Sequence, residues 1–331
     1  MKRICSLLLA LAILLSLCAC KKLPESSESI LYAMDTQMDF RLYGDDDGAA
    51  AQSLGDLIAG LELELSATDN RSDLSMLNRL GSSTNADILA LLRAAQTLSA
   101  RTDGALDPTI YPLVKLWGFT ADAYRIPREE ELESTLKLVG LGRVHLYDDH
   151  VELDEDTMLD FGALAKGYAA DLCRAELEKR QLTGILSLGG NIQTVGEKPD
   201  KTPWTIGVQD PDDPAAYVVT LAVEGTRAVV TSGDYQRYFE YDGTRYCHIF
   251  DPATGCPVQG ELRSVTVVAE SGLLADGLST ALFVMGYDKG AALWRESDDF
   301  ECIWLFSDGS VRLTQGLEQA ASGCAFTVVR R

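Results

Sequence analysis

The strongest constraint on the fold is a series of short apolar segments in the second half of the chain. Each segment has the alternating or clustered apolar pattern of a strand and is bounded by turn residues. The segments are 184–190, 204–210, 217–225, 227–233, 238–250 and 264–271. Asp242 and Gly243, in the middle of 238–250, are a strong signal for a two-residue hairpin. The pattern therefore predicts a strand-rich second half.

The rest of the chain mixes helical periodicity with fewer strands. The expected elements are a strand over 30–44, helices over about 49–65, 86–100 and 128–140, a hairpin over 144–162 turning at 148–150, a helix reaching about residue 180, a helix over 273–286 and a closing hairpin around 307–310. No repeat or Pro/Gly-rich linker follows residue 30. We predict one α+β domain over residues 31–331, with a mixed or antiparallel β-sheet core and flanking helices, although an inserted subdomain remains an alternative.

The first twenty residues have the features of a secretory signal. Two basic residues precede an apolar run, and small residues surround Cys20. The ending Leu17-Cys18-Ala19-Cys20 resembles the bacterial lipobox, in which the last cysteine is lipidated; a single-pass anchor helix is the alternative. Residues 21–30 are expected to be a flexible tether. The expected location is the extracytoplasmic face of the cell membrane, with the protein held by its lipid.

Composition excludes some functions. The 331 residues carry a formal net charge of -21, which disfavours nucleic acid as a partner because phosphates require clustered Lys and Arg. The five cysteines that follow the signal form no CxxC pair, so neither a disulfide framework nor a zinc site is indicated. Buried thiols are favoured, with a Cys247–Cys256 pair as the alternative. Because the chain has only three histidines, a metal site would use mainly oxygen ligands, which favours Mg²⁺ or Ca²⁺.

The segment 275–286 places a carboxylate and a hydroxyl on one face of an apolar helix. Asp276 and Thr280 stand four residues apart, and their oxygens would suit Mg²⁺. Alternatively, Asp276 caps the helix and Thr280 bonds back to a carbonyl, which is the more common situation for such a pair taken alone.

Other polar stretches are equally ambiguous when taken singly. "SLGGN" at 187–191 suits either phosphate or a plain turn, and the aromatics of "DPTIYPLVKLWGF" suit either a planar ligand or the core. His248, in "HIFDPATGCP", could act as a general base or as a phosphate donor. Lys166 could neutralise a phosphate or extend along the helix surface. His145 and His150 lie in the expected surface hairpin and receive no role.

Together, these stretches resemble the FAD:protein FMN transferase family, also called ApbE or flavin transferases, from about Met34 onward. The matching features are Met34 with Thr36, "DGALDPT" with "PLVKLWGF", "DFGALAKGYAAD", "LGGN", "PWTIGVQDP", "TSGDYQRYF", "HIFDPATGCP" and "ADGLSTALFVMG". The resemblance implies binding of FAD with a divalent metal, normally Mg²⁺, cleavage of its pyrophosphate, and transfer of FMN to a Ser or Thr hydroxyl of another protein with loss of AMP. The chain would need no nucleophile of its own.

The resemblance also assigns residues. The backbone carbonyl of Ala163, with Asp276 and Thr280, would hold the metal. The residues that would contact FAD are Met34, Ala105, Leu106, Asp107, Asp160, Lys166 and Ile249. His248 or Asp251 is the candidate base, by proximity to the motif. Acceptors in the family are exported or membrane redox proteins, such as subunits of Rnf- or Nqr-type complexes.

One loop departs from the family pattern. Where many relatives carry an aromatic residue near the flavin, "LSATDNRSDLS" places Ala67 and Thr68. The loss of a stacking partner would weaken FAD retention or admit water. An FAD pyrophosphatase that yields FMN and AMP is therefore one alternative function. A lipoprotein that only binds flavin is another, but a carrier has no need for the Asp276 and Thr280 pair.

Overall fold

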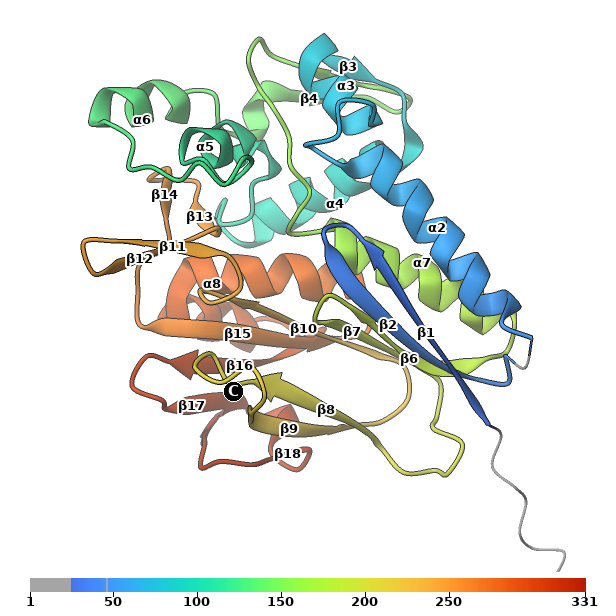
Figure 1. The fold of residues 1–331 in the computed structure, drawn as a ribbon. Coiled ribbons are helices and arrows are strands. Elements are labelled where there is room, and N and C mark those ends of the chain that lie inside the picture. The colour runs from blue at the N-terminus through green and yellow to red at the C-terminus, as the bar shows by residue number, and fades with distance from the viewer. Residues whose placement is uncertain (1–24, 46) are drawn as a thin grey trace, which may run out of the picture.

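The computed structural model describes residues 25–45 and 47–331 (Figure 1). The expected signal, Cys20 and residues 21–24 of the expected tether lie outside these ranges. Within them, no helix has both the length and the apolar character needed to cross a membrane.

A nine-stranded sheet forms the centre of the molecule. Its order is β1-β2-β6-β7-β10-β15-β16-β17-β19, and all neighbours are antiparallel except β17 and β19. The strands are β1 Ser26–Ala33, β2 Thr36–Tyr43, β6 Thr183–Leu188, β7 Asn191–Val195, β10 Arg227–Gly233, β15 Leu262–Ala269, β16 Phe300–Phe306, β17 Val311–Thr314 and β19 Thr327–Val329.

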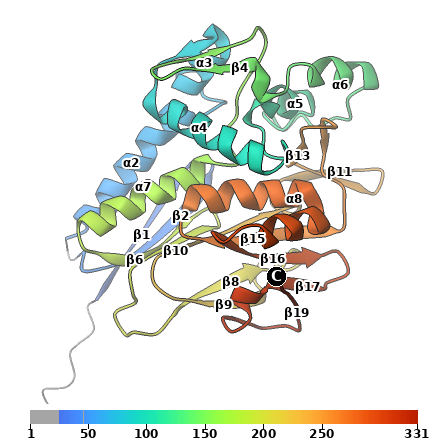
Figure 2. The ribbon, with the colours of Figure 1, turned by 180° about the vertical axis from the view of Figure 1, so that it is seen from behind.

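Both faces of this sheet are covered. Helices α7 (Ala165–Lys179) and α8 (Gly272–Arg295) cross one face and, with α2 (Ala49–Leu65) and α4 (Ala86–Arg101), bury the largest apolar core (Figures 1 and 2). The other face packs against a three-stranded sheet of β8 (Trp204–Gln209), β9 (Tyr217–Val223) and β18 (Ala321–Ser322) through a second core. Burial of apolar side chains on both faces is the main stabilising contribution to this layered arrangement.

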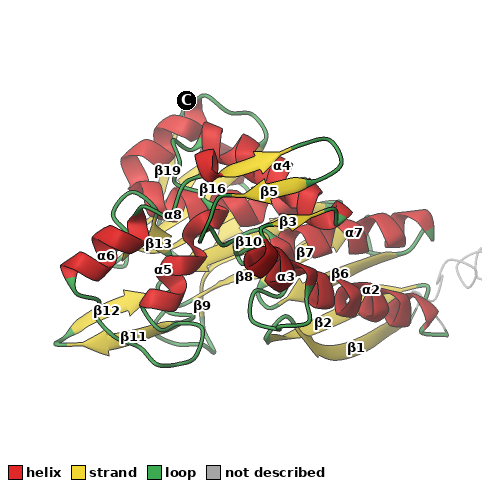
Figure 3. Cartoon of the chain, turned by 90° about the horizontal axis from the view of Figure 1, so that it is seen from above, coloured by secondary structure: helices red, strands yellow, loops and turns green. Residues whose placement is uncertain are grey.

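Smaller elements lie above the α7 and α8 layer. Near α2 are α3 (Asp73–Leu80) and the small sheet of β3 (Ser82–Ser83), β4 (Val144–Leu146) and β5 (Val151–Leu153). At the other end, seen from above in Figure 3, are α5 (Tyr111–Leu116), α6 (Glu129–Leu136) and the hairpins β11 (Tyr238–Tyr241) with β12 (Thr244–Cys247) and β13 (Phe250–Asp251) with β14 (Cys256–Pro257). Short 3₁₀ turns occupy Pro108–Ile110, Leu141–Arg143 and Gln315–Leu317.

The α+β prediction is confirmed, as are the hairpins at Asp242-Gly243 and at 148–150. The expected strand over 30–44 is wrong, because it is two strands joined by a turn at Met34 and Asp35. Residues 26–30, expected in the tether, pair with β2; their polar composition resembles disorder, but the neighbouring strand supplies hydrogen-bonding partners.

Two helix ends also differ from the prediction. The helix expected over 128–140 ends at Leu136. The helix expected to end at Gly286 continues to Arg295, past a non-helical break in which Gly286 has a φ of 75°. Glycine tolerates this conformation, so it bends the helical segment here and does not terminate it.

All five described cysteines are free thiols, and Cys247 and Cys256 are unpaired. Cys173, Cys247 and Cys302 are buried, as favoured, whereas Cys256 and Cys324 are partly exposed. Burial raises the pKa of Cys173 to about 12 and that of Cys247 to about 11. These thiols are therefore protonated at neutral pH and poorly reactive.

The crossing of α7 over α8 requires glycine. A Cβ atom at Gly167 would lie 2.2 Å from the carbonyl oxygen of Gly272. We expect Gly167→Ala to reduce the free energy of unfolding by about 1–3 kcal/mol, because the helices would have to separate. Gly60→Ala is the matched control: its Cβ would meet nothing within 4 Å, so the gain in helix propensity should stabilise by roughly 0.5–1 kcal/mol. Urea unfolding of both variants measures the difference; equal stabilities would contradict the close-contact argument.

Candidate active site

The site is built around the α7–α8 crossing. Asp276, in the second turn of α8, is 3% exposed, and its Oδ2 accepts a hydrogen bond of 2.8 Å from the backbone N–H of Gly167. Asp276 does not cap the helix, because Ser271 does. In a regular helix the N–H of Gly167 would bond to the carbonyl of Ala163. Here the Gly167 N–H donates to Asp276 instead, and no hydrogen bond within the described residues uses the Ala163 carbonyl oxygen.

A second contact fixes the same crossing. Asp171, one turn beyond Gly167 on α7, accepts hydrogen bonds from the backbone N–H groups of Gly272 and Leu273 and from the Ser271 hydroxyl. A carboxylate at this position satisfies donors at the α8 N-terminus and complements the helix dipole. Asp171 therefore positions Asp276, a role that we did not predict because its partners lie 100 residues away.

Thr280 belongs to a group of hydroxyls. Its Oγ1 lies 3.0 Å from Oγ of Ser232, which also lies 2.8 Å from Oγ of Ser279. No hydrogen bond in the described structure joins Thr280 back to a helix carbonyl, so the alternative structural interpretation of the pair does not hold. Ser232 and Ser279 hold the Thr280 hydroxyl on the face that Asp276 occupies.

The donor set fits a small divalent cation. Three oxygens, from the Ala163 carbonyl, the Asp276 carboxylate and the Thr280 hydroxyl, come from this crossing, and hard oxygen donors are the ligands that Mg²⁺ prefers. Oδ1 of Asp276 makes no hydrogen bond within residues 25–45 and 47–331 and so is available to a cation. In the same ranges, no group of three or more His, Cys, Asp or Glu side chains is arranged to hold a metal.

The loop before α7 places a second carboxylate near this crossing. The Asp160 N–H donates to the carbonyl of Pro108, and its Oδ1 accepts from the N–H of Gly162, which stabilises the turn. Burial raises the pKa of Asp160, while the Gly162 N–H and the charges of Arg237 and Lys166 oppose the rise.

Two cations remain available for an anion. Lys166 makes no hydrogen bond or ion pair within the described residues, and Arg237 donates only one hydrogen bond, of 3.0 Å, to the carbonyl of Phe119. Lys166 stands in the first turn of α7, which has no side-chain cap. The N-terminus of such a helix attracts negative charge. The arrangement is suited to a phosphate.

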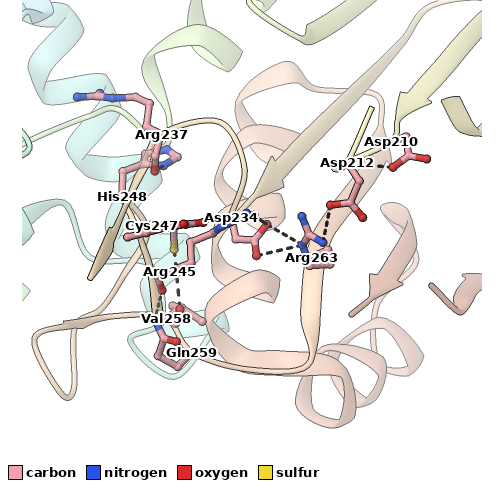
Figure 4. Close-up of polar contacts among 11 residues, drawn as sticks. Asp210, Asp212, Asp234, Arg237, Arg245, Cys247, His248, Val258, Gln259 and Arg263 are labelled. Carbon is pink, nitrogen blue, oxygen red and sulfur yellow. Dashed lines mark hydrogen bonds and ion pairs between the residues drawn. The ribbon is translucent and has the colours of Figure 1, made fainter. Parts of the chain in front are cut away.

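His248 lies beside Arg237 (Figure 4). Burial and the Arg237 charge lower the pKa of His248 to about 4, so its imidazole is neutral at pH 7. Its Nδ1 lies 3.2 Å from the Arg237 carbonyl, which can only accept a hydrogen bond. Nδ1 therefore carries the proton, and Nε2 presents a lone pair. A neutral imidazole with an unprotonated nitrogen is the form that a general base requires.

Asp251, the other candidate base, has a different role. Its carboxylate accepts hydrogen bonds from the N–H of Ala253 and the hydroxyl of Thr254, and its carbonyl accepts from the N–H of Gly255. The residue organises the turn that follows β13. Within the described residues no hydrogen bond or ion pair joins its carboxylate to His248, and we take His248 as the candidate base.

An ion-pair network holds the segment that carries Arg237. Arg263 pairs with Asp234 at 3.0 Å and with Asp212 at 3.1 Å, and Arg245 lies 3.6 Å from Asp234 (Figure 4). Arg263 is largely buried, so solvent screens its pairs less than it would screen exposed ones. The network connects the start of β15 with the loop between β10 and β11.

Two hairpin turns lie together at one end of the sheet. Met34 and Asp35 have φ values of 50° and 59°, and the Met34 N–H donates to Oε1 of Glu62 at 3.0 Å. The second turn, at Gly189 and Gly190, explains the "LGGN" stretch, because a Cβ at Gly189 would lie 2.5 Å from the Thr36 side chain. Gly189 is required for this close approach, and both glycines have positive φ, of 62° and 92°.

Two of the remaining residues predicted to contact FAD have their side chains buried in the core. Leu106 and Ile249 are 3% and 5% exposed, so their side chains belong to the core. Ala105 packs against that core, and Asp107 caps the turn at Pro108–Ile110, where burial raises the pKa of its carboxyl. A direct contact of Leu106 or Ile249 with FAD would therefore use main-chain atoms.

The aromatic residues that follow Asp107 belong to the apolar core, which is the more common role of such a dense aromatic segment. Trp117 and Phe119 are buried with Phe250 in a third apolar cluster. Tyr111, on the same segment, donates a 2.8 Å hydrogen bond to the carbonyl of Ala67. This bond fixes the loop of Ala67 and Thr68, the one that departs from the family pattern, to the segment that follows Asp107.

Comparison with known proteins identifies the family. Residues 34–304 match the model of the ApbE family. The FAD:protein FMN transferase of Vibrio cholerae is 34% identical over 298 residues, which are 86% of this chain and 89% of that protein. The protein of the same name from Treponema pallidum is 33% identical, over 81% and 80% of the two chains.

Solved structures give the same result. The ApbE protein of Thermotoga maritima superposes with a TM-score of 0.84 at 32% identity, over 89% of this chain and 99% of that one. The apo flavinyl transferase ApbE of Pseudomonas stutzeri superposes with a TM-score of 0.82 at 30% identity, over 92% and 99%. The fold is thus that of the flavin transferases. The chain belongs to the ApbE family, and the resemblance seen in the sequence is confirmed.

Proposed function

We propose that this protein is an FAD:protein FMN transferase that uses Mg²⁺ to pass the FMN moiety of FAD to a Ser or Thr hydroxyl of an exported or membrane flavoprotein, releasing AMP. The observation that carries the proposal is the convergence at the α7 N-terminus. Asp276, a buried carboxylate whose Oδ1 makes no hydrogen bond within the described residues, bonds to the first turn of α7, and Arg237, whose side chain makes one hydrogen bond, lies beside the neutral imidazole of His248. The names of the relatives supply the reaction.

Each residue has a task in this reaction. Lys166, Arg237 and the N-terminus of α7 bind and orient the pyrophosphate, and Asp160 shapes the turn that precedes them. The acceptor hydroxyl attacks the FMN-side phosphorus, while its proton passes to Nε2 of His248. The new oxygen–phosphorus bond forms as the bond to the AMP oxygen breaks, and AMP departs. Because His248 is neutral and held by its Nδ1 hydrogen bond, it is ready to accept that proton.

Ala163, Asp276 and Thr280 would hold Mg²⁺, which supplies charge neutralisation at the phosphoryl oxygens. Asp276 contributes the only formal charge of this set, so most of the binding energy should depend on it. Met34 and the 105–107 turn would contact the flavin or adenine, and Ile249 would contact it through its main chain.

The acceptor and the location form part of the same proposal. The signal-like N-terminus, with Cys20 as the lipidated residue, would hold the protein on the extracytoplasmic face of the membrane. Exported or membrane redox proteins, such as Rnf- or Nqr-type subunits, would then be within reach. A lipid mass on Cys20 in the purified protein tests the anchor.

The test of function is a transfer assay. The full-length protein in detergent is incubated with FAD, Mg²⁺ and a Thr-containing domain of an Nqr-type subunit, and the acceptor is measured by intact mass. A gain equal to an FMN phosphoester with equimolar AMP is the expected result. AMP with free FMN and unmodified acceptors, across more than one acceptor, would establish the pyrophosphatase instead. Retained FAD without AMP would establish a carrier.

A further inference from the structure

Strand β8 has a free edge. The small sheet runs in the order β18-β9-β8, so β8 is bonded only to β9. Its sequence from Trp204 to Gln209 contains no charged residue and no proline. Proteins commonly protect exposed edges with such residues, because an open edge can pair with another chain. This edge lacks that protection.

The strand register shows which backbone groups face outward. The Ala222 N–H donates to Ala320 and the Thr220 carbonyl accepts from the Ser322 hydroxyl, so both residues of β9 direct their backbone groups toward β18. Their β8 partners, Thr205 and Gly207, are therefore at positions whose N–H and C=O groups point away from β9. No hydrogen bond between described residues uses these outward groups.

A cavity of about 380 Å³ adjoins this edge. Three consecutive residues of β8, Thr205, Ile206 and Gly207, line the cavity. Because successive side chains of a strand point to opposite faces, three in a row line one cavity when the strand presents its edge to it. None of the residues that line the cavity is charged. In a chain of net charge -21, such a neutral lining is suited to peptide groups and small side chains, and it offers a phosphate no cation.

The cavity borders the segment that carries Arg237. Gln236, at its rim, is followed directly by Arg237, whose carbonyl accepts the hydrogen bonds from Nδ1 and the N–H of His248. Gly190, on the same rim, belongs to the turn that packs on Thr36 beside Met34. A chain that follows the β8 edge would therefore come close to His248.

We propose that the free edge of β8 binds an extended segment of the acceptor protein as an added strand and so presents the acceptor hydroxyl near His248. Backbone hydrogen bonds to Thr205 and Gly207 supply affinity, and the neutral cavity selects small uncharged side chains around the modified residue. The inference rests on the proposed transfer reaction and adds the mode of acceptor recognition.

Thr205→Pro tests the edge. Proline removes the outward N–H of residue 205 and leaves the hydrogen bonds between β8 and β9, because that N–H does not take part in them. With the full-length protein and the Nqr-type acceptor domain, we expect the acceptor KM to rise about ten-fold, the effect of one lost hydrogen bond. The kcat at saturating acceptor and the affinity for FAD should stay within about two-fold. Thr205→Val, which keeps the N–H and the shape, should match the wild type.

Hydrogen exchange gives a second measurement that needs no variant. The amides of Thr205 and Gly207 should exchange freely in the wild-type protein and become protected when the acceptor is added. An unchanged KM in Thr205→Pro, or transfer without protection of β8, would overturn the inference. Protection that grows with protein concentration alone would assign the edge to a second copy of the chain. A wild-type protein that labels no acceptor would instead refute the proposed function.

Discussion

Replacement of Asp276 by alanine should abolish Mg²⁺-dependent FAD turnover and leave the protein folded. Asp276 is the only charged member of the proposed ligand set, and loss of the metal's charge stabilisation, about 4 kcal/mol or more, corresponds to a rate about 10³-fold lower. Alanine also leaves the Gly167 N–H without its acceptor, which costs about 1–3 kcal/mol of stability. Steady-state AMP release and thermal unfolding measure the two effects.

Asp276→Asn separates the two effects. The amide oxygen can still accept from Gly167, so stability should remain near that of the wild type, while the lost charge should again suppress turnover. Isothermal titration with Mg²⁺ should show weakened metal binding in both variants. If Asp276→Asn kept wild-type turnover, Asp276 would have no place in the metal site.

Replacement of His248 by alanine should lower FMN transfer about 10²–10⁴-fold, the contribution of a positioned general base. Binding of FAD should change little, because Lys166 and Arg237 remain to pair with the pyrophosphate. His145→Ala is the matched control: His145 is exposed and pairs only with Asp154 on the surface hairpin, so the rate should not change. Equal rates for the two variants would exclude His248 as the base.

The pH profile gives an independent check on His248. The reaction needs the neutral imidazole, so kcat/KM for FAD should be level near neutral pH and fall as pH drops through the free-protein pKa of about 4. Burial and the positive charges of Arg237 and Lys166 depress this pKa, and the bound pyrophosphate offsets the two charges. The acid limb of kcat should therefore lie at higher pH than that of kcat/KM. An acid limb that persists in His248→Ala would belong to another group.

Local pattern was sufficient where a short segment carries its own signal. The helix over 49–65 has the predicted bounds, and Asp242-Gly243 forms the predicted turn. The spacing of Asp276 and Thr280 places both on one face whatever the rest of the chain does. The order of the motifs along the chain was also enough to indicate the family.

Local pattern failed where distant parts of the chain decide the structure. Met34 and Asp35 look like strand residues, yet both adopt positive φ in a turn that Glu62 of α2 supports. Asp251 looks like a free carboxylate beside His248, but its own loop uses both of its oxygens.

By itself, the sequence determined the types of element, the candidate ligands and the family, because periodicity, turn residues and motif order are local properties. Tertiary structure alone decided how they work together. It placed Asp171 at the N-terminus of α8, freed the Ala163 carbonyl by drawing the Gly167 N–H to Asp276, and set the tautomer of His248 through the carbonyl of Arg237. Each of these outcomes depends on a hydrogen bond between groups that only the fold brings within about 3 Å of one another.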